Sequence, residues 1–176
     1  MQKIQTQVKD LFLVKLDIFE DSRGFFTEKF NKQKWQKLFP GIEFVQDNFS
    51  RSRHGVIRGL HAQNSCAKLV GVANGVILDI AVDIRPKSET FGKIFETELS
   101  CVNGMMLFLP EGFLHGFQVI SSSADVHYKV TKPYNPAEEI RVNPLDQNLN
   151  IAWKLRENII MSDKDASAPF FADLFG

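Results

Sequence analysis

The segment from Val76 to Arg85 limits the possible folds of this chain more strongly than any other stretch. Apolar residues occupy every second position in it, and polar or small residues stand between them. A period of two is the pattern of a β-strand that has one buried face. We therefore predict a half-buried strand here, with Asp79 and Asp83 on its polar face. The residues of its apolar face are Leu78, Ile80, Val82 and Ile84.

Shorter apolar stretches separated by turn residues continue along most of the chain. One short helix is predicted before them, because Asn31 is a good N-cap and Trp35 and Phe39 share a helical face. The C-terminal residues from Ser162 onward are predicted to be at most partly helical. Many short strands joined by turns favour an all-β sandwich or barrel. The other predicted strands are Leu11–Phe19, Phe25–Phe30, Ile94–Ser100, Met105–Leu109, Phe117–Ile120 and Asp125–Thr131.

Composition and charge narrow the class of protein. A chain of 176 residues is expected to form one domain over residues 1–176. Its net charge of zero supplies no overall field that would attract nucleic acid or an anionic membrane. We find no signal-peptide pattern and no apolar run of about 18 residues. Cys66 and Cys101 have neither metal nor redox spacing, so free thiols in a reducing cytoplasm are expected.

Polar and cationic residues gather in the segment from Phe44 to Val70. Three arginines, the His61 imidazole and the Lys68 ammonium lie there between strand-like apolar residues. Such groups on a strand framework suggest an anionic ligand and proton chemistry. The alternative is a polar loop that carries scattered surface charges.

The four histidines differ in their expected places. His54, in a polar loop, is expected at the surface, and His127 is expected to point outward. His115 belongs to a Pro-x-Gly-x-x-His pattern that is typical of the second half of the cupin signature. Many cupins bind a metal at that position, but a metal site needs three or four ligands and typically a His-x-His pair upstream. Because the second residue after His61 is Gln63, we predict no metal site.

A barrel that holds His, Lys, Arg and Tyr side chains suits acid–base chemistry without a metal. A histidine is a good general base near neutral pH, and a carboxylate on its second nitrogen would fix its tautomer. Tyr128 shares a strand face with Val126 and is therefore expected to point inward. Arg58 and His61 are three positions apart, so they line one site only if Gly59 permits a bulge or bend.

These segments together resemble the dTDP-4-dehydrorhamnose 3,5-epimerase family of cupin enzymes. The resemblance implies a cupin-type double-stranded β-helix, or jelly-roll barrel. The matches run in order over nearly the whole chain, and their joint specificity is high although none alone is specific. They are DSRGFFTE (21–28), FVQDNFSRS (44–52), RGLHAQ (58–63), AKLV (67–70), VDIRPKSETFGK (82–93), LPEGFLHGF (109–117), YKVTKPY (128–134), Glu139 and SDKD (162–165).

The resemblance implies a role for each matched residue. The family removes a proton next to the substrate ketone and returns one to the opposite face, without a cofactor. His61 would be the base, Asp165 its orienting carboxylate, and Tyr128 the acid. Lys68 would stabilise the enolate, and Tyr134 would stack on the nucleotide base. Further substrate-binding positions are Arg23, Glu28, Gln46, Asn48, Arg58, His115, Glu139 and Lys164.

The resemblance also implies a homodimer with exchanged N-terminal strands, in which Arg23 and Glu28 act across the interface. Simpler readings of single residues remain open. Asp165 could be a helix N-cap, Lys68 an exposed strand residue, and Tyr134 a brace for a turn. Arg23 and Glu28 could form an ordinary surface ion pair.

Two departures from the family pattern leave the sugar and the number of inverted carbons open. Ala62 stands where an aromatic residue usually follows the histidine, and would remove an aromatic wall near the sugar. The run IRVNPLD (140–146) replaces a Gly-Ile-x-Trp-Asn-Asp-Pro-like run. A single-site epimerase of another nucleotide-linked 4-keto-6-deoxy sugar is therefore the nearest rival. A non-catalytic sugar-nucleotide-binding or metal-binding cupin is the rival from another class.

Overall fold

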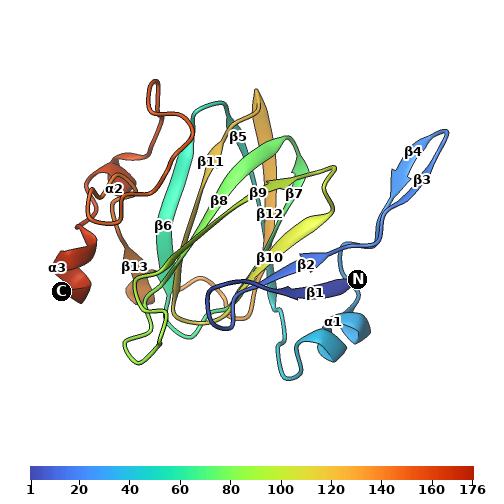
Figure 1. Cartoon of the computed structure of the whole chain (residues 1–176), viewed down its shortest axis with the longest axis horizontal. Coiled ribbons are helices and arrows are strands. Elements are labelled where there is room, and N and C mark those ends of the chain that lie inside the picture. The colour runs from blue at the N-terminus through green and yellow to red at the C-terminus, as the bar shows by residue number, and fades with distance from the viewer.

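The computed structural model describes residues 1–176, and strands dominate it (Figure 1). The first strands are β1 (Gln2–Gln5), β2 (Phe12–Lys15), β3 (Phe19–Asp21), β4 (Gly24–Phe26), β5 (Gln46–Arg53), β6 (Ile57–Gln63) and β7 (Lys68–Asn74). The later strands are β8 (Val76–Asp83), β9 (Ile94–Ser100), β10 (Met105–Leu109), β11 (Phe113–Val119), β12 (Ser123–Val130) and β13 (Glu139–Arg141). The helices are α1 (Lys32–Leu38), α2 (Asp163–Ala166), α3 (Phe171–Phe175) and a 3₁₀ turn at Pro136–Glu138.

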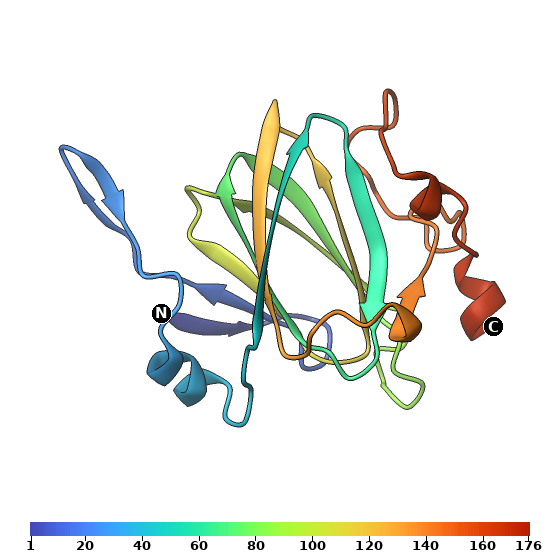
Figure 2. The same cartoon turned by 180° about the vertical axis from the view of Figure 1, so that it is seen from behind.

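Two antiparallel sheets face each other and form the body of the molecule (Figures 1 and 2). One has the strand order β1-β2-β10-β7-β12-β5, and the other has the order β13-β6-β11-β8-β9. The largest apolar cluster joins them, with Val70 and Val126 from the first sheet and Ala81 and Phe117 from the second. The predicted all-β jelly-roll architecture is therefore confirmed.

Strand β8 is buried on both faces, so the prediction of a half-buried strand was wrong. Its alternating apolar residues, such as Leu78 and Ile80, face an outer cluster that the C-terminal segment covers with Ile151 and Trp153. The opposite face points into the barrel, and Asp79 on it is fully buried. The alternation predicted the strand correctly, but it cannot reveal that a distant segment covers the face toward solvent.

Helix α1 forms as the sequence predicts. The Asn31 side chain caps its first turn by accepting hydrogen bonds from the backbone N–H groups of Gln33 and Lys34. Its Trp35 lies in a third apolar cluster with Phe39 and Phe108, on the outside of the larger sheet. None of the helices has the length and apolar character that crossing a membrane requires.

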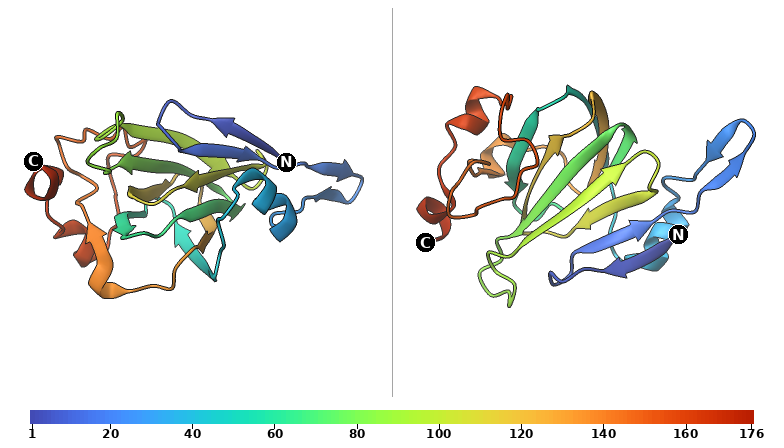
Figure 3. Two further views of the ribbon diagram at one scale, coloured as in Figure 1. Left: turned by 90° about the horizontal axis from the view of Figure 1, so that it is seen from below. Right: turned by 45° about the horizontal axis from the view of Figure 1, so that its top comes forward.

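A short hairpin, β3–β4, extends away from the body of the molecule, at the end opposite to α2 and α3 (Figure 3). The predicted strand Phe25–Phe30 is mostly wrong, because the observed strand β4 ends at Phe26. Strand β1 was not predicted. Phe19, Phe25 and Phe26 of the hairpin are 62%, 49% and 68% exposed. Aromatic side chains on a projecting hairpin lack the packing that their apolar surface favours.

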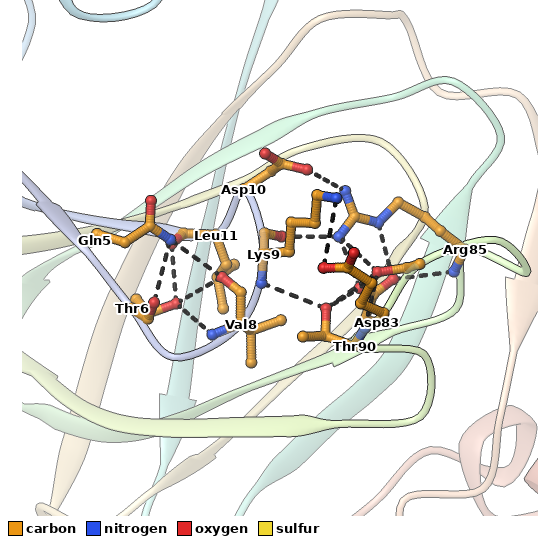
Figure 4. A network of polar contacts seen from close by, with 11 residues as sticks. Gln5, Thr6, Val8, Lys9, Asp10, Leu11, Asp83, Arg85 and Thr90 are labelled. Atoms are coloured by element: carbon orange, nitrogen blue, oxygen red, sulfur yellow. Dashed lines mark hydrogen bonds and ion pairs between the residues drawn. The ribbon is translucent and has the colours of Figure 1, made fainter.

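A polar network centred on the buried carboxylate of Asp83 anchors the turn after β1 to the end of β8 (Figure 4). Asp83 accepts hydrogen bonds from Arg85 at 2.9 and 2.7 Å and from Thr90 at 2.7 Å. Arg85 also donates to Asp10 over 2.8 Å, and the backbone N–H of Lys9 donates to Thr90. Burial alone would raise the pKa of Asp83, but the hydrogen bonds from its neighbours outweigh burial and lower this pKa to about 2.

Replacing Asp83 by Asn is expected to lower the free energy of unfolding at pH 7 by about 2 kcal/mol. A lowered carboxyl pKa contributes stability above the unfolded value, and this contribution is lost as the pH falls from about 4 to about 2. Urea unfolding at several pH values measures the difference. Glu98→Gln, which breaks the exposed pair with Lys154, is the control and should cost less than about 1 kcal/mol. An equal loss in both variants would contradict this account.

Candidate active site

A cavity of about 610 Å³ opens between the two sheets. Side chains from both sheets and from the C-terminal segment line it. A smaller cavity of about 140 Å³ is lined by several of the same residues. His61, Lys68 and Tyr128 line both cavities, so three of the four predicted catalytic residues lie where the cavities meet.

A β-bulge in β6 brings Arg58 and His61 to the same cavity. These residues are three positions apart, whereas their partners on β11, Phe117 and His115, are two positions apart. Gly59 lies within the bulge with a φ of +128°, and a Cβ there would lie 2.5 Å from a backbone atom of β11. Glycine tolerates both the positive φ and the close approach. The prediction that Gly59 permits a bulge is therefore confirmed.

His61 and Asp165 form a hydrogen-bonded pair at the wall of the cavity. The Nε2 atom of His61 lies 2.6 Å from Oδ1 of Asp165, which is only 4% exposed. Burial would raise the pKa of Asp165, but hydrogen bonds with His61 and Ser162 and the nearby charges of His61 and Arg141 together outweigh burial and lower it. The ionised carboxylate accepts from Nε2–H, and this leaves Nδ1 of His61 as the free base nitrogen.

Asp165 reaches His61 from α2, a single turn of helix. Ser162 is the N-cap of α2, since its side chain accepts from the backbone N–H of Asp165. The alternative reading of Asp165 as an N-cap is therefore wrong. Its carboxylate is free to bond His61, 104 residues earlier in the chain.

Tyr128 and Lys68 approach the cavity from the sheet opposite to His61. They lie on the neighbouring strands β12 and β7. Burial raises the pKa of Tyr128, so its phenol keeps its proton at neutral pH. Burial lowers the pKa of Lys68 to about 8, and its Nζ donates to the backbone oxygen of His61 over 3.0 Å. The reading of Lys68 as an exposed strand residue is therefore wrong.

A second histidine–carboxylate pair lies deeper in the same wall. The Nε2 atom of His115 is 2.7 Å from Oδ1 of Asp79, whose side chain is fully buried. This bond fixes the orientation of the His115 ring at the cavity. From the sequence, Asp79 was predicted only as a residue of the polar strand face. Its position on the inward face of β8 could have suggested a role in the site.

Arg141, which was not among the predicted site residues, is part of the site. Its Nη1 donates to Asp165 over 2.9 Å and lies 3.2 Å from Nε2 of His61. Its Nε and Nη2 donate to Oε2 of Glu139 over 3.0 and 2.7 Å. The Tyr134 hydroxyl donates to the same oxygen over 3.1 Å. The spacing of Glu139 and Arg141 places both on one strand face, which was the available signal.

Most of the predicted substrate-binding residues line the two cavities. Arg23 and Glu28 do not: Arg23 pairs with Asp21 in the projecting hairpin, and Glu28 pairs with Lys34 of α1. The predicted positions at the larger cavity are Arg58, His115 and Lys164, and those at the smaller one are Gln46, Asn48, Tyr134 and Glu139.

The other two histidines lie outside the cavities. His54 is exposed, as predicted. His127 points away from the barrel interior, but it is partly buried against Lys29, whose Nζ lies 3.3 Å from it. Burial and the neighbouring lysines lower the pKa of His127 to about 4. No three His, Cys, Asp or Glu side chains are grouped as a metal site.

Comparison with known proteins agrees with this geometry. The model of the dTDP-4-dehydrorhamnose 3,5-epimerase family matches residues 5–173. The chain belongs to this family. The Shigella flexneri dTDP-4-dehydrorhamnose 3,5-epimerase is 41% identical over 98% of this chain and 97% of its own.

Solved structures of epimerases superimpose over nearly the whole chain. That of the Elizabethkingia anophelis dTDP-4-dehydrorhamnose 3,5-epimerase is 43% identical, with a TM-score of 0.91, and the match covers 100% of this chain and 99% of that one. A Legionella pneumophila dTDP-6-deoxy-D-glucose-3,5-epimerase, solved with dTDP-4-keto-L-rhamnose, is also 43% identical. Its TM-score is 0.93, and coverage is 99% of this chain and 94% of that one.

The two departures from the family pattern lie next to each other. Ala62 on β6 is paired with Ile140 on β13, the first residue of the changed run. Ala62 is buried in the outer apolar cluster with Val142, while the neighbouring His61 faces the larger cavity. Ala62 borders only the smaller of the two cavities that His61 lines. The two changes therefore meet at the contact between β6 and β13.

Proposed function

We propose that this chain is an epimerase that inverts carbons 3 and 5 of dTDP-4-keto-6-deoxy-D-glucose and gives dTDP-4-keto-L-rhamnose. One observation carries the proposal. The hydrogen-bonded pair of His61 and Asp165 lines one cavity, and the protonated Tyr128 lines it from the sheet opposite to His61. Lys68 lines the same cavity. Inversion needs a proton removed from one face of a carbon and returned to the other, and this arrangement supplies both groups.

His61 takes the proton from the carbon next to the ketone, using Nδ1. Asp165 holds the ring and stabilises the imidazolium that forms. The electron pair of the broken C–H bond moves into the ketone, which becomes an enolate. Tyr128 then gives its proton to the opposite face of that carbon, and the enolate returns to the ketone. The substrate ketone accepts the electrons, so the chemistry uses no cofactor.

Lys68 stabilises the enolate oxygen with its ammonium group. Burial favours this role, because charge interactions are stronger in a site from which water is excluded. Arg58 and Lys164, which have cationic side chains at the larger cavity, hold the diphosphate. Tyr134 stacks on the nucleotide base, and Gln46 and Asn48 contact the substrate. Glu139 and His115 complete the binding surface.

Incubation of the purified protein with dTDP-4-keto-6-deoxy-D-glucose and a chelator tests the proposal. We expect conversion to dTDP-4-keto-L-rhamnose, and chromatography of the nucleotide sugars measures it. Inversion at one carbon would indicate the single-site epimerase. Binding of the substrate without conversion would instead support the sugar-nucleotide-binding cupin.

We further propose that the active unit is a homodimer of single-domain chains (1–176) with exchanged N-terminal hairpins, working in the cytoplasm. Arg23 and Glu28 contact neither cavity of their own chain, whereas the hairpin that carries Arg23 presents Phe19 and Phe26 to solvent. A second copy would bury these rings and receive Arg23 at its site. The free thiols of the chain fit a reducing compartment.

Mixing two inactive variants is expected to restore activity in part. In a dimer of His61→Ala and Arg23→Ala chains, the site that keeps His61 receives Arg23 from the other chain. Co-expression with two affinity tags isolates the mixed dimer, and sedimentation analysis establishes its size. Each variant alone serves as the control. A mixed dimer no more active than the mean of the two parent dimers, or a monomeric wild-type protein, would contradict the exchange.

A further inference from the structure

The guanidinium of Arg141 occupies a place that the reaction described above leaves unexplained. It lies between two carboxylates, Glu139 and Asp165, and touches the ring of the base. On β13, Arg141 is the direct cross-strand partner of His61 on β6. Residues directly opposite in a ladder have their side chains close together. The sheet itself therefore sets the distance between guanidinium and imidazole.

Arg141 and His61 donate to the same oxygen of Asp165. The two bonds measure 2.9 and 2.6 Å, and the two donor nitrogens are 3.2 Å apart. Two donors on one oxygen fix the carboxylate against rotation. The guanidinium also places a permanent positive charge beside Asp165, and this charge helps to lower the pKa of that carboxyl.

Glu139 determines which nitrogen of Arg141 is left for Asp165. Its Oε2 accepts from Nε and Nη2 and leaves Nη1 directed toward the His61–Asp165 pair. The Tyr134 hydroxyl donates to that same Oε2. A chain of hydrogen bonds therefore runs from Tyr134 through Glu139 and Arg141 to the pair. The planar guanidinium suits this double contact, and a lysine ammonium does not.

We propose that Arg141 is a positioning residue for the proposed epimerisation, and that it holds the Asp165 carboxylate on His61. The inference rests on the proposed function only for its kinetic part. Its structural part, a fixed ring tautomer in the free protein, stands without any substrate.

Other charged groups near His61 do not take this role. Lys68, from β7, bonds the backbone oxygen of His61 rather than Asp165. Tyr128, from β12, is neutral because burial raises its pKa. His115 on β11 is bonded to Asp79 of β8. Arg58 on β6 itself donates through Nε to Ser52, and Lys164 of α2 lines the cavity without an ion-pair partner.

Arg141→Gln and Arg141→Lys test the proposal. In Arg141→Gln we expect kcat to fall by about ten-fold or more at neutral pH, with KM changed less than about three-fold. The acid limb of its kcat profile should move upward, because Asp165 loses a cation that helps to lower its pKa. Arg141→Lys keeps the charge, so it should keep the position of the acid limb while losing part of kcat. Arg156→Gln removes an exposed arginine away from the cavities and is the matched control.

Nitrogen NMR of the His61 ring separates the two proposals. The wild-type protein without substrate should show one tautomer, with the proton on Nε2, and Arg141→Gln should show a mixture. If the two proteins differ in this way but the wild type converts no keto sugar, the proposed function is excluded and the positioning role is retained. An unchanged tautomer and pH profile, or a rise in KM alone, would overturn the role of Arg141.

Discussion

Replacing His61 by Ala is expected to lower the rate of epimerisation by about 10² to 10⁴-fold. Nδ1 of His61 is the nitrogen that the bond to Asp165 leaves free, and it is the atom proposed to take the proton. Lys68 carries a proton at neutral pH, so it does not replace His61 as a base. Single-turnover kinetics with the dTDP-linked 4-keto sugar measure the loss.

The fold should survive this substitution, because His61 lies at a cavity wall and is partly exposed. Unfolding by urea checks this point. His54→Ala removes an exposed histidine in the loop before β6 and is the control, with an expected rate close to that of the wild type. Proton exchange between substrate and solvent that continues in His61→Ala would exclude His61 as the base.

Replacing Lys68 by Met is expected to lower kcat by about 10² to 10³-fold. The ammonium is the positive charge proposed for the developing enolate oxygen, and Met keeps the length of the side chain without the charge. The wild-type rate should also fall as the pH rises above about 8, where burial makes Lys68 lose its proton. This alkaline limb should be absent from the residual activity of Lys68→Met.

The control for Lys68 is Lys93→Met, which removes an exposed lysine from the connection between β8 and β9. It should leave both kcat and the alkaline limb unchanged. A Lys68→Met variant with a normal kcat would show that the enolate is stabilised elsewhere. The same alkaline limb in both variants would assign that limb to another group.

Local patterns in the sequence were sufficient for most of the fold. The strand that begins at Val76 and the strands Ile94–Ser100 and Met105–Leu109 were predicted correctly. The period of the apolar residues and the turn residues are local signals. The cap of α1 at Asn31 is equally local. The hairpin β3–β4 and strand β1 are too short to give a periodic signal.

The site was predictable only where side-chain direction follows from strand alternation. Tyr128 lies on the inward face, as its spacing from Val126 indicated. The contact between His61 and Asp165 joins residues 104 positions apart, and only the resemblance to a family suggested it. Arg141 lies in a run that departs from the family pattern, so neither local pattern nor resemblance selected it. Its role depends on the pairing of β13 with β6, which no short stretch of sequence reveals.

Proton NMR of dTDP-4-keto-6-deoxy-D-glucose in deuterated water, with the purified protein and a chelator, shows whether the protein exchanges the protons next to the ketone. We expect loss of the proton signals at carbons 3 and 5, together with new resonances of the inverted sugar. Loss at one carbon alone would restrict the activity to a single site. Retention of both signals while the substrate stays bound would contradict the claim that His61, Asp165 and Tyr128 form an acid–base site for this sugar.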